Sequence, residues 1–188
     1  MNFTRTPIND VYIIEPSVYK DDRGYFFESF NEKEFQAKTS LNTSFIQDNE
    51  SKTKKNVLRG LHFQTFPYAQ SKLVRVINGK ILDVAVDLRK NSSTFKKYFS
   101  IELSSTNKKQ LFIPRGFAHG FISLKDDTIV NYKVDNFYSQ KHDSGIIYND
   151  SDLNIDWGKI DNIVLSEKDA NLKTLQETDI DCFKLWRD

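Results

Sequence analysis

The dipeptide Asn78-Gly79 most restricts how this chain can fold, because it separates two apolar runs. Asn-Gly is the strongest short-range signal for a β-hairpin, since both central turn positions take a positive φ. We therefore predict that residues 72–77 and 80–88 pair as antiparallel strands. The second run alternates between two faces, as a central strand does. Its apolar face comprises Leu82, Val84, Val86 and Leu88, and its mixed face comprises Asp83, Ala85 and Asp87.

Other short runs along the chain have the composition of strands. They lie at residues 11–14, 25–30, 44–49, 57–63, 95–103, 110–113, 119–124 and 128–134. Turn-forming clusters such as SSTN and KDD separate them. Many short strands at nearly regular spacing predict a mainly β protein, built as an antiparallel barrel or sandwich.

Two helices are expected in addition to the strands. Asn31 followed by Glu34 has the spacing of a capping box, which predicts a short N-terminal helix over residues 31–38. Ser166 provides an N-cap for an amphipathic C-terminal helix, predicted over residues 166–175.

Length and composition limit the class of protein. At 188 residues the chain is predicted to form one domain, with N-terminal strands and a helix over 1–50, a β core over 51–157 and a helical segment over 158–188. The formal charge of +1 gives no electrostatic footprint for nucleic acid or a membrane surface. The single cysteine, Cys182, excludes an internal disulfide, and no signal peptide or membrane span is predicted. We therefore expect a cytoplasmic protein.

Residues 56–77 gather polar side chains, including Arg59 and His62, between two strand-like runs. In the second of these runs, Lys72 shares a strand face with Val74 and Val76. Burying an ammonium group among apolar side chains is costly unless it is paired. Lys72 is therefore predicted either to lie at the mouth of a pocket or to have an anionic partner.

Short motifs along nearly the whole chain resemble those of one protein family. DDRGYFFE, VLRGLHFQ, AQSKLVRVINGKILDVAVDLR, IPRGFAHGF, YNDSDLNIDW and LSEKD occur in the order expected of the dTDP-4-dehydrorhamnose 3,5-epimerase family. The resemblance implies a cupin-type jelly roll and a homodimer that shares its N-terminal strands. It also implies a thymidine-diphospho 4-keto-6-deoxy sugar as substrate, with neither a metal nor an organic cofactor.

The expected chemistry needs three groups. Epimerisation beside a ketone requires a base that removes the α proton, a positive charge that stabilises the enolate, and an acid that returns a proton on the opposite face. His62 is the candidate base, because histidine is the side chain that most readily exchanges protons near neutral pH. Lys72 is the candidate for the enolate, although a lysine at a strand end can also extend toward solvent. Tyr132 shares a face with Val130 and Val134, and the resemblance selects it as the acid.

Asp169 has two alternative roles. It resembles the family's carboxylate that hydrogen-bonds the base, holds one tautomer and stabilises the imidazolium. It also lies three residues after Ser166, so helix capping alone could explain it. Both roles stay open at the level of sequence.

The resemblance also implies a set of substrate-binding residues. Guanidinium groups match a diphosphate well, and Arg23 and Arg59 align with family positions that contact it. Tyr138 matches the aromatic side chain that stacks on thymine. The remaining binding positions are Glu28, Gln47, Asn49, His119, Lys168 and Asp143, the last of which is often glutamate in relatives.

Arg59 and His62 are three residues apart, so they would face opposite ways in a regular strand. The resemblance nevertheless directs both side chains to the ligand. We therefore predict a bulge or sharp bend at or near Gly60.

Alternative functions differ in the residues that they need. A metal-binding cupin presents an HxH pair, a glutamate and a further histidine, whereas this chain has His62, Gln64, Gln70 and His119 there, and amide oxygens are poor transition-metal ligands. A non-catalytic nucleotide-sugar binder would not need a base together with an acid. A monoepimerase, inverting C3 or C5 alone, would use the same residues. We predict cofactor-independent inversion at both C3 and C5 of dTDP-4-dehydro-6-deoxy-D-glucose, which gives dTDP-4-dehydro-L-rhamnose in dTDP-L-rhamnose biosynthesis.

Overall fold

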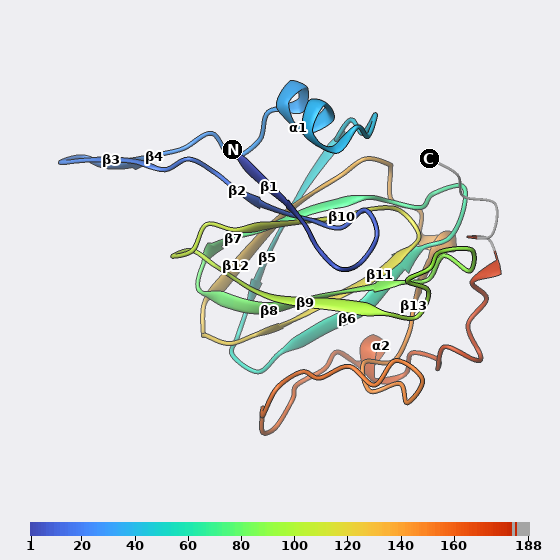
Figure 1. The fold of residues 1–188 in the computed structure, drawn as a ribbon. Coiled ribbons are helices and arrows are strands. Elements are labelled where there is room, and N and C mark those ends of the chain that lie inside the picture. The colour runs from blue at the N-terminus through green and yellow to red at the C-terminus, as the bar shows by residue number, and fades with distance from the viewer. Residues whose placement is uncertain (182, 184–188) are drawn as a thin grey trace.

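Two antiparallel β-sheets form the body of the protein, seen in a computed structural model that describes residues 1–181 and residue 183 (Figure 1). The first sheet has six strands in the order β1-β2-β10-β7-β12-β5, and the second has five in the order β13-β6-β11-β8-β9. The hairpin of β3 and β4 projects away from this body in Figure 1. The prediction of a mainly β sandwich is confirmed. Cys182 lies outside the described residues.

The strands are short, as the spacing of the turn signals predicts. They are β1 (Asn2–Arg5), β2 (Tyr12–Glu15), β3 (Tyr19–Asp21), β4 (Gly24–Phe26), β5 (Gln47–Thr53), β6 (Leu58–Gln64), β7 (Lys72–Asn78), β8 (Lys80–Asp87), β9 (Tyr98–Ser104), β10 (Gln110–Ile113), β11 (Phe117–Ser123), β12 (Thr128–Val134) and β13 (Asp143–Gly145).

The turn at Asn78-Gly79 is present, but the hairpin predicted around it is wrong. β7 pairs with β10 and β12, whereas β8 pairs with β11 and β9, so the two runs belong to different sheets. Of the two turn residues only Gly79 has a positive φ, of 82°. Peptide groups at the corner bond to other segments, because Ser105 N–H donates to Gly79 O at 3.0 Å and Leu124 N–H donates to Lys80 O at 2.9 Å. The dipeptide therefore turns the chain from one sheet into the other.

β5 extends further than its apolar content predicts. We expect a strand over residues 44–49 followed by a polar loop, but β5 continues to Thr53 and pairs with β12 along its length. Its less exposed alternate positions include Gln47, Asn49 and Ser51, which are polar. Hydrophobic periodicity gives no signal for such a strand. The sequence also does not predict β1, β3 or β13, and β4 ends at Phe26 where a run to residue 30 is expected.

The N-terminal helix α1 (Glu32–Thr39) begins as predicted. Asn31 Oδ1 accepts a hydrogen bond from Glu34 N–H at 3.1 Å, and Phe35 is only 1% exposed. Phe35 packs on Phe112 of the first sheet with 4.9 Å between ring centroids. Burying an aromatic side chain of this kind contributes about 1.5–3 kcal/mol, so this contact fixes the helix to the sheet.

The C-terminal helix α2 (Glu167–Ala170) is present but shorter than predicted, and its expected extension to residue 175 is wrong. Ser166 caps it by accepting from Asp169 N–H at 3.1 Å. Beyond the helix, tertiary hydrogen bonds replace helical ones. Lys173 O accepts from Ile147 N–H at 2.8 Å, and Leu175 N–H donates to Asp150 Oδ2 at 2.7 Å.

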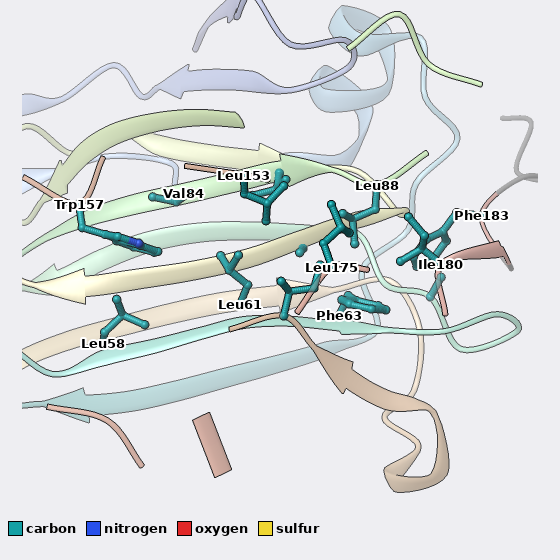
Figure 2. Packing of buried hydrophobic residues seen from close by; sticks show 14 of the residues in the cluster. Leu58, Leu61, Phe63, Val84, Leu88, Leu153, Trp157, Leu175, Ile180 and Phe183 are labelled. Carbon is teal, nitrogen blue, oxygen red and sulfur yellow. The ribbon is translucent and has the colours of Figure 1, made fainter. Parts of the chain in front are cut away.

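The apolar face of β8 lies on the outer side of the second sheet. There the segment that follows β13 covers it and supplies buried side chains to one cluster (Figure 2). These side chains are Leu153, Trp157, Leu175, Ile180 and Phe183. The mixed face of β8, with Asp83 and Asp87, therefore points between the two sheets, where Ala85 packs in a separate cluster. In the part of the chain that the structure describes, no helix is long and apolar enough to cross a membrane.

Candidate active site

Two adjoining cavities lie beside strands of both sheets, with volumes of about 530 Å³ and about 380 Å³. We call them the first and second compartments. Four predicted residues line both compartments, so the two belong to one site: His62, Lys72, Tyr132 and Lys168. The first compartment also has Arg59, His119 and Asp169 in its wall, and the second has Gln47, Asn49, Tyr138 and Asp143.

β6 is irregular at Gly60, as predicted. Two residues of this strand, Gly60 and Leu61, face the single residue Gly120 of β11, because the register shifts there. Gly60 has φ 124°, and a Cβ atom there would lie 2.6 Å from Gly120 Cα. The extra residue lets Arg59 and His62 both line the first compartment.

Asp169 joins the candidate base to α2. Its Oδ1 lies 2.6 Å from His62 Nε2, while its backbone N–H donates to Ser166 Oγ. The backbone of Asp169 thus takes part in helix capping and its carboxylate contacts His62, so the two roles considered from the sequence coexist. Burial opposes ionisation of this carboxyl, but the hydrogen bond and charge of His62, together with the hydrogen bonds from Gly60 and Ser166, outweigh burial and lower the pKa of Asp169.

The His62–Asp169 contact also defines which ring nitrogen is available. An ionised carboxylate can only accept, so Nε2 of a neutral His62 carries the hydrogen and donates it to Asp169. Nδ1 is then the basic nitrogen. No residue within the described part of the chain hydrogen-bonds Nδ1 of His62, and the imidazole borders both compartments.

Lys72 has a histidine and a carboxylate behind it. Its Nζ lies 3.5 Å from His119 Nδ1, and His119 Nε2 lies 2.8 Å from Asp83 Oδ1. Burial lowers the pKa of Lys72 to about 8, against the opposing effect of Asp83 and Asp143. Lys72 is therefore still mainly an ammonium ion at neutral pH. Burial also lowers the pKa of His119, so this imidazole is neutral beside the lysine.

Tyr132 faces inward on β12, as its spacing from Val130 and Val134 predicts, since both valines are 0% exposed. Burial raises the pKa of the Tyr132 hydroxyl, and Arg59 opposes this effect. The hydroxyl is therefore protonated at neutral pH and able to give up a proton to a strong base such as an enolate.

A cluster of three predicted binding residues borders the second compartment. Tyr138 Oη donates to Asp143 Oδ2 at 3.0 Å, and Lys168 Nζ donates to the same oxygen at 2.5 Å. Burial opposes the charge on Lys168, but the hydrogen bond and charge of Asp143, together with the charges of Tyr138 and Asp169, outweigh burial and raise the pKa of Lys168. The side chain of Tyr138 is exposed, which leaves an aromatic face open to a flat ligand.

Arg59 is held by β5. Its Nε donates to Thr53 Oγ1 at 3.1 Å and its Nη2 donates to Lys52 O at 3.3 Å. On the same strand, Gln47 Nε2 donates to Asn49 Oδ1 at 2.9 Å. The polar inward face of β5 therefore lines the second compartment and positions a guanidinium at the first.

Gln64 and Gln70 support the loop that carries Tyr138. Gln64 Oε1 accepts from Ser139 N–H at 2.7 Å, and Gln70 Nε2 donates to Asn136 O at 2.8 Å. Among residues 1–181 and 183, no group of three His, Cys, Asp or Glu side chains is arranged to hold a metal ion.

Arg23 and Glu28 line neither compartment. Arg23 lies at the turn of the β3–β4 hairpin, where its side chain is 90% exposed and paired with Asp21. Glu28 accepts a hydrogen bond from Asn31 at 3.3 Å. A single chain therefore does not bring these two predicted residues to the cavity.

Asp83 and Thr53 belong to this site, but no sequence motif selects them. Asp83 is visible in the sequence only as an acidic residue on the mixed face of a strand. Thr53 falls in the stretch expected to be a loop. Their contacts with His119 and Arg59 depend on pairings between strands that are distant in sequence.

A jelly-roll sandwich with an imidazole–carboxylate pair, a lysine and a tyrosine around one cavity defines a cupin-type protein equipped for acid–base chemistry. The family model described as dTDP-4-dehydrorhamnose 3,5-epimerase matches residues 5–177. The chain belongs to this family, so the resemblance predicted from the sequence is confirmed.

Relatives match over nearly their full length. The dTDP-4-dehydrorhamnose 3,5-epimerase of Escherichia coli is 51% identical, with 94% of this chain and 96% of the relative covered. The crystal structure of the enzyme from Elizabethkingia anophelis is also 51% identical, with a TM-score of 0.90 and 94% and 97% coverage. The epimerase of Legionella pneumophila, solved in complex with dTDP-4-keto-L-rhamnose, is 41% identical, with a TM-score of 0.95 and 100% and 99% coverage.

Proposed function

We propose that this protein inverts C3 and C5 of dTDP-4-dehydro-6-deoxy-D-glucose and so produces dTDP-4-dehydro-L-rhamnose, for dTDP-L-rhamnose biosynthesis in the cytoplasm. The observation that carries the proposal is the His62–Asp169 contact of 2.6 Å beside a cavity that Lys72 and Tyr132 also line. Base, cation and acid are the three groups that epimerisation beside a ketone requires.

Each inversion follows the same sequence of proton transfers. His62 Nδ1 takes the proton from the carbon beside the C4 ketone, the C–H electron pair moves toward C4, and the C4 oxygen becomes an enolate. Asp169 stabilises the resulting imidazolium, and the ammonium of Lys72 stabilises the enolate. Tyr132 then gives its hydroxyl proton to the same carbon from the opposite face. Exchange with water returns His62 and Tyr132 to their starting protonation states.

The nucleotide occupies the second compartment in this proposal. Tyr138 offers an exposed ring for stacking on thymine, which contributes about 1–3 kcal/mol for a base on an aromatic side chain. Lys168 and Arg59 supply positive charge toward the diphosphate, and Gln47 and Asn49 supply polar contacts.

We also propose a homodimer in which the β3–β4 hairpin of each chain reaches the site of the other. The exposed position of Arg23 supports this arrangement, as do the exposed aromatic side chains Tyr19, Tyr25 and Phe26 on the same hairpin. Each hairpin, with the segment that follows β4, would then add Arg23 and Glu28 to its partner's cavity.

Mixing two inactive variants tests the dimer. In a heterodimer of Arg23→Ala and His62→Ala chains, one site would combine an intact His62 with an intact partner hairpin. Random reassociation would therefore restore about a quarter of wild-type activity. No activity above that of the separate variants, with heterodimers shown to form, would contradict the shared site.

Incubation of the enzyme with the 4-keto substrate in heavy water tests the reaction. Mass and proton spectra should show two solvent deuterons, at C3 and C5, and the inverted product. One deuteron would instead indicate a monoepimerase. Binding of the sugar nucleotide with no exchange at either carbon would contradict the enzymatic function.

A further inference from the structure

The reaction described above does not use the carboxylate of Asp83. Asp83 lies on the inner face of β8 and is 0% exposed, and its Oδ1 contacts His119 Nε2 at 2.8 Å. Its other oxygen, Oδ2, has no hydrogen-bond partner among the residues that the structure describes. Burying a carboxylate oxygen without a donor is costly. Its partner His119 lines the first compartment, so this costly carboxylate lies directly behind the active-site wall.

We propose that Asp83 is a positioning residue for the reaction, which acts through His119 to hold Lys72 as an ammonium ion facing the enolate oxygen. This inference rests on the proposed function and deepens it. It assigns a role to a carboxylate that the sequence reasoning did not select.

The hydrogen bonds define one direction along the three residues. An ammonium can only donate, so Lys72 requires an acceptor at His119 Nδ1, 3.5 Å away. The hydrogen of a neutral His119 must then be on Nε2, where the Asp83 carboxylate accepts it at 2.8 Å. Asp83 therefore fixes the tautomer of His119 that presents a lone pair to Lys72.

Charge gives Asp83 its second effect. Burial favours the neutral amine of Lys72, and the negative charge of Asp83 opposes this, as does that of Asp143. Oδ2 of Asp83 has no hydrogen-bond donor in the described structure. The negative charge of Asp83 is therefore compensated less by nearby donors than the charge of a fully hydrogen-bonded carboxylate. The titratable and charged groups that line the cavity with Lys72 are Arg59 and His62 on β6, His119 on β11, Tyr132 on β12, Tyr138 in the loop after β12, Asp143 on β13, and Lys168 and Asp169 on α2.

Asp87 provides a matched comparison on the same face of the same strand. It is also 0% exposed, but Arg89 Nε donates to its Oδ1 at 2.9 Å, and Ser92 and Thr94 hydroxyls donate to its Oδ2 at 2.6 and 2.7 Å. Its charge is thus satisfied locally, and its hydrogen-bond partners include neither His119 nor Lys72. Substitution of Asp87 therefore serves as a control, because it removes a buried carboxylate that does not act on Lys72.

The test is the pH profile of kcat/KM for Asp83→Asn, which keeps an oxygen acceptor for His119 but removes the charge. In the wild-type enzyme, activity should fall as pH rises through about 8, because Lys72 loses its proton. Removal of a nearby negative charge lowers the pKa of a lysine, so this fall should move to lower pH by about one unit. Asp87→Asn should leave its position unchanged.

The possible outcomes separate the two proposals. An inactive wild-type enzyme would contradict the proposed function. If Asp83→Asn is folded and active, and its kcat/KM falls at the same alkaline pH as that of the wild-type enzyme, the role of Asp83 is overturned but the proposed function is not. If Asp83→Asn fails to fold, nitrogen-15 NMR of wild-type His119 decides. A neutral ring with hydrogen on Nε2 is expected, and a charged ring or hydrogen on Nδ1 would overturn the inference.

Discussion

Two histidine–carboxylate pairs among the described residues each place an imidazole at the same cavity, but they differ in exposure and in their neighbours. The His62 side chain is 30% exposed and that of Asp169 is 5%, whereas the His119 and Asp83 side chains are 8% and 0% exposed. His62 keeps one ring nitrogen open toward the cavity, while both nitrogens of His119 contact protein groups.

This difference shows how one type of pair can serve two purposes. The accessible pair can exchange protons with a ligand, because its imidazole reaches the cavity and its carboxylate stabilises the charged form. The enclosed pair has no ring nitrogen left for a ligand, so it acts on its neighbour Lys72. Substitutions in and around the accessible pair test this division.

His62→Ala should have the largest effect. Removal of the base from the accessible pair should lower kcat by about 10²–10⁴-fold, since this is what positioned proton transfer contributes. Deuterium exchange in heavy water measures the loss, and calorimetry with dTDP should show nearly unchanged affinity. If exchange persists at the wild-type rate, another residue is the base.

Asp169→Asn should have the next largest effect. The variant keeps the backbone N–H that donates to Ser166 but loses the charge beside His62, so we expect a loss of about 100-fold in kcat, the lower end of what positioned proton transfer contributes. Stopped assays of product formation would measure it, and the thermal midpoint should change little. Full activity of this variant would show that the Asp169 carboxylate does not assist His62, which contradicts the role given to the accessible pair.

Gly60→Ala should disrupt the bulge that brings His62 to its partner. A Cβ atom at this position would lie 2.6 Å from Gly120 Cα on a residue with φ 124°, so we expect destabilisation by about 2–3 kcal/mol. Chemical denaturation would measure this loss. Gly24→Ala is the matched control, because that glycine has a similar φ of 128° but no atom within 4 Å of the added Cβ. Equal losses for the two variants would show that the close packing at Gly60 is unimportant.

Ser166→Ala should have the smallest effect. It removes the cap of α2 and should cost about 1 kcal/mol of stability, while the Asp169 carboxylate remains to contact His62. Thermal unfolding and kcat measured together separate these quantities. A loss of activity as large as that of Asp169→Asn would show that the cap, and not the carboxylate, determines the geometry of the accessible pair.

Sequence patterns predict where the helices and strands of this fold lie better than they predict which strands pair. The alternation of β8 and the capping pair Asn31 and Glu34 depend on neighbours in sequence, and the structure agrees with both. Asn78-Gly79 correctly predicts a turn, but local conformation does not determine which sheet the next strand joins. That choice depends on the apolar face of β8, which packs against side chains from Leu153 onward, far away in sequence.

The site shows the same limit. Motif resemblance selects His62, Lys72, Tyr132 and Asp169, and the expected bend at Gly60 follows from the alternation of strand faces. Asp83 is missed because its partner His119 lies 36 residues away on a neighbouring strand. Arg23 and Glu28 match family positions, but one chain does not bring them to the cavity.

In the proposed mechanism the base and the acid act on opposite faces of the sugar, and the reaction of the Tyr132→Phe variant in heavy water tests this arrangement. His62 should still remove the proton and return a deuteron from the same face. Mass and proton spectra should therefore show a deuterated sugar with its original configuration. Formation of the inverted product at the wild-type rate would contradict this account.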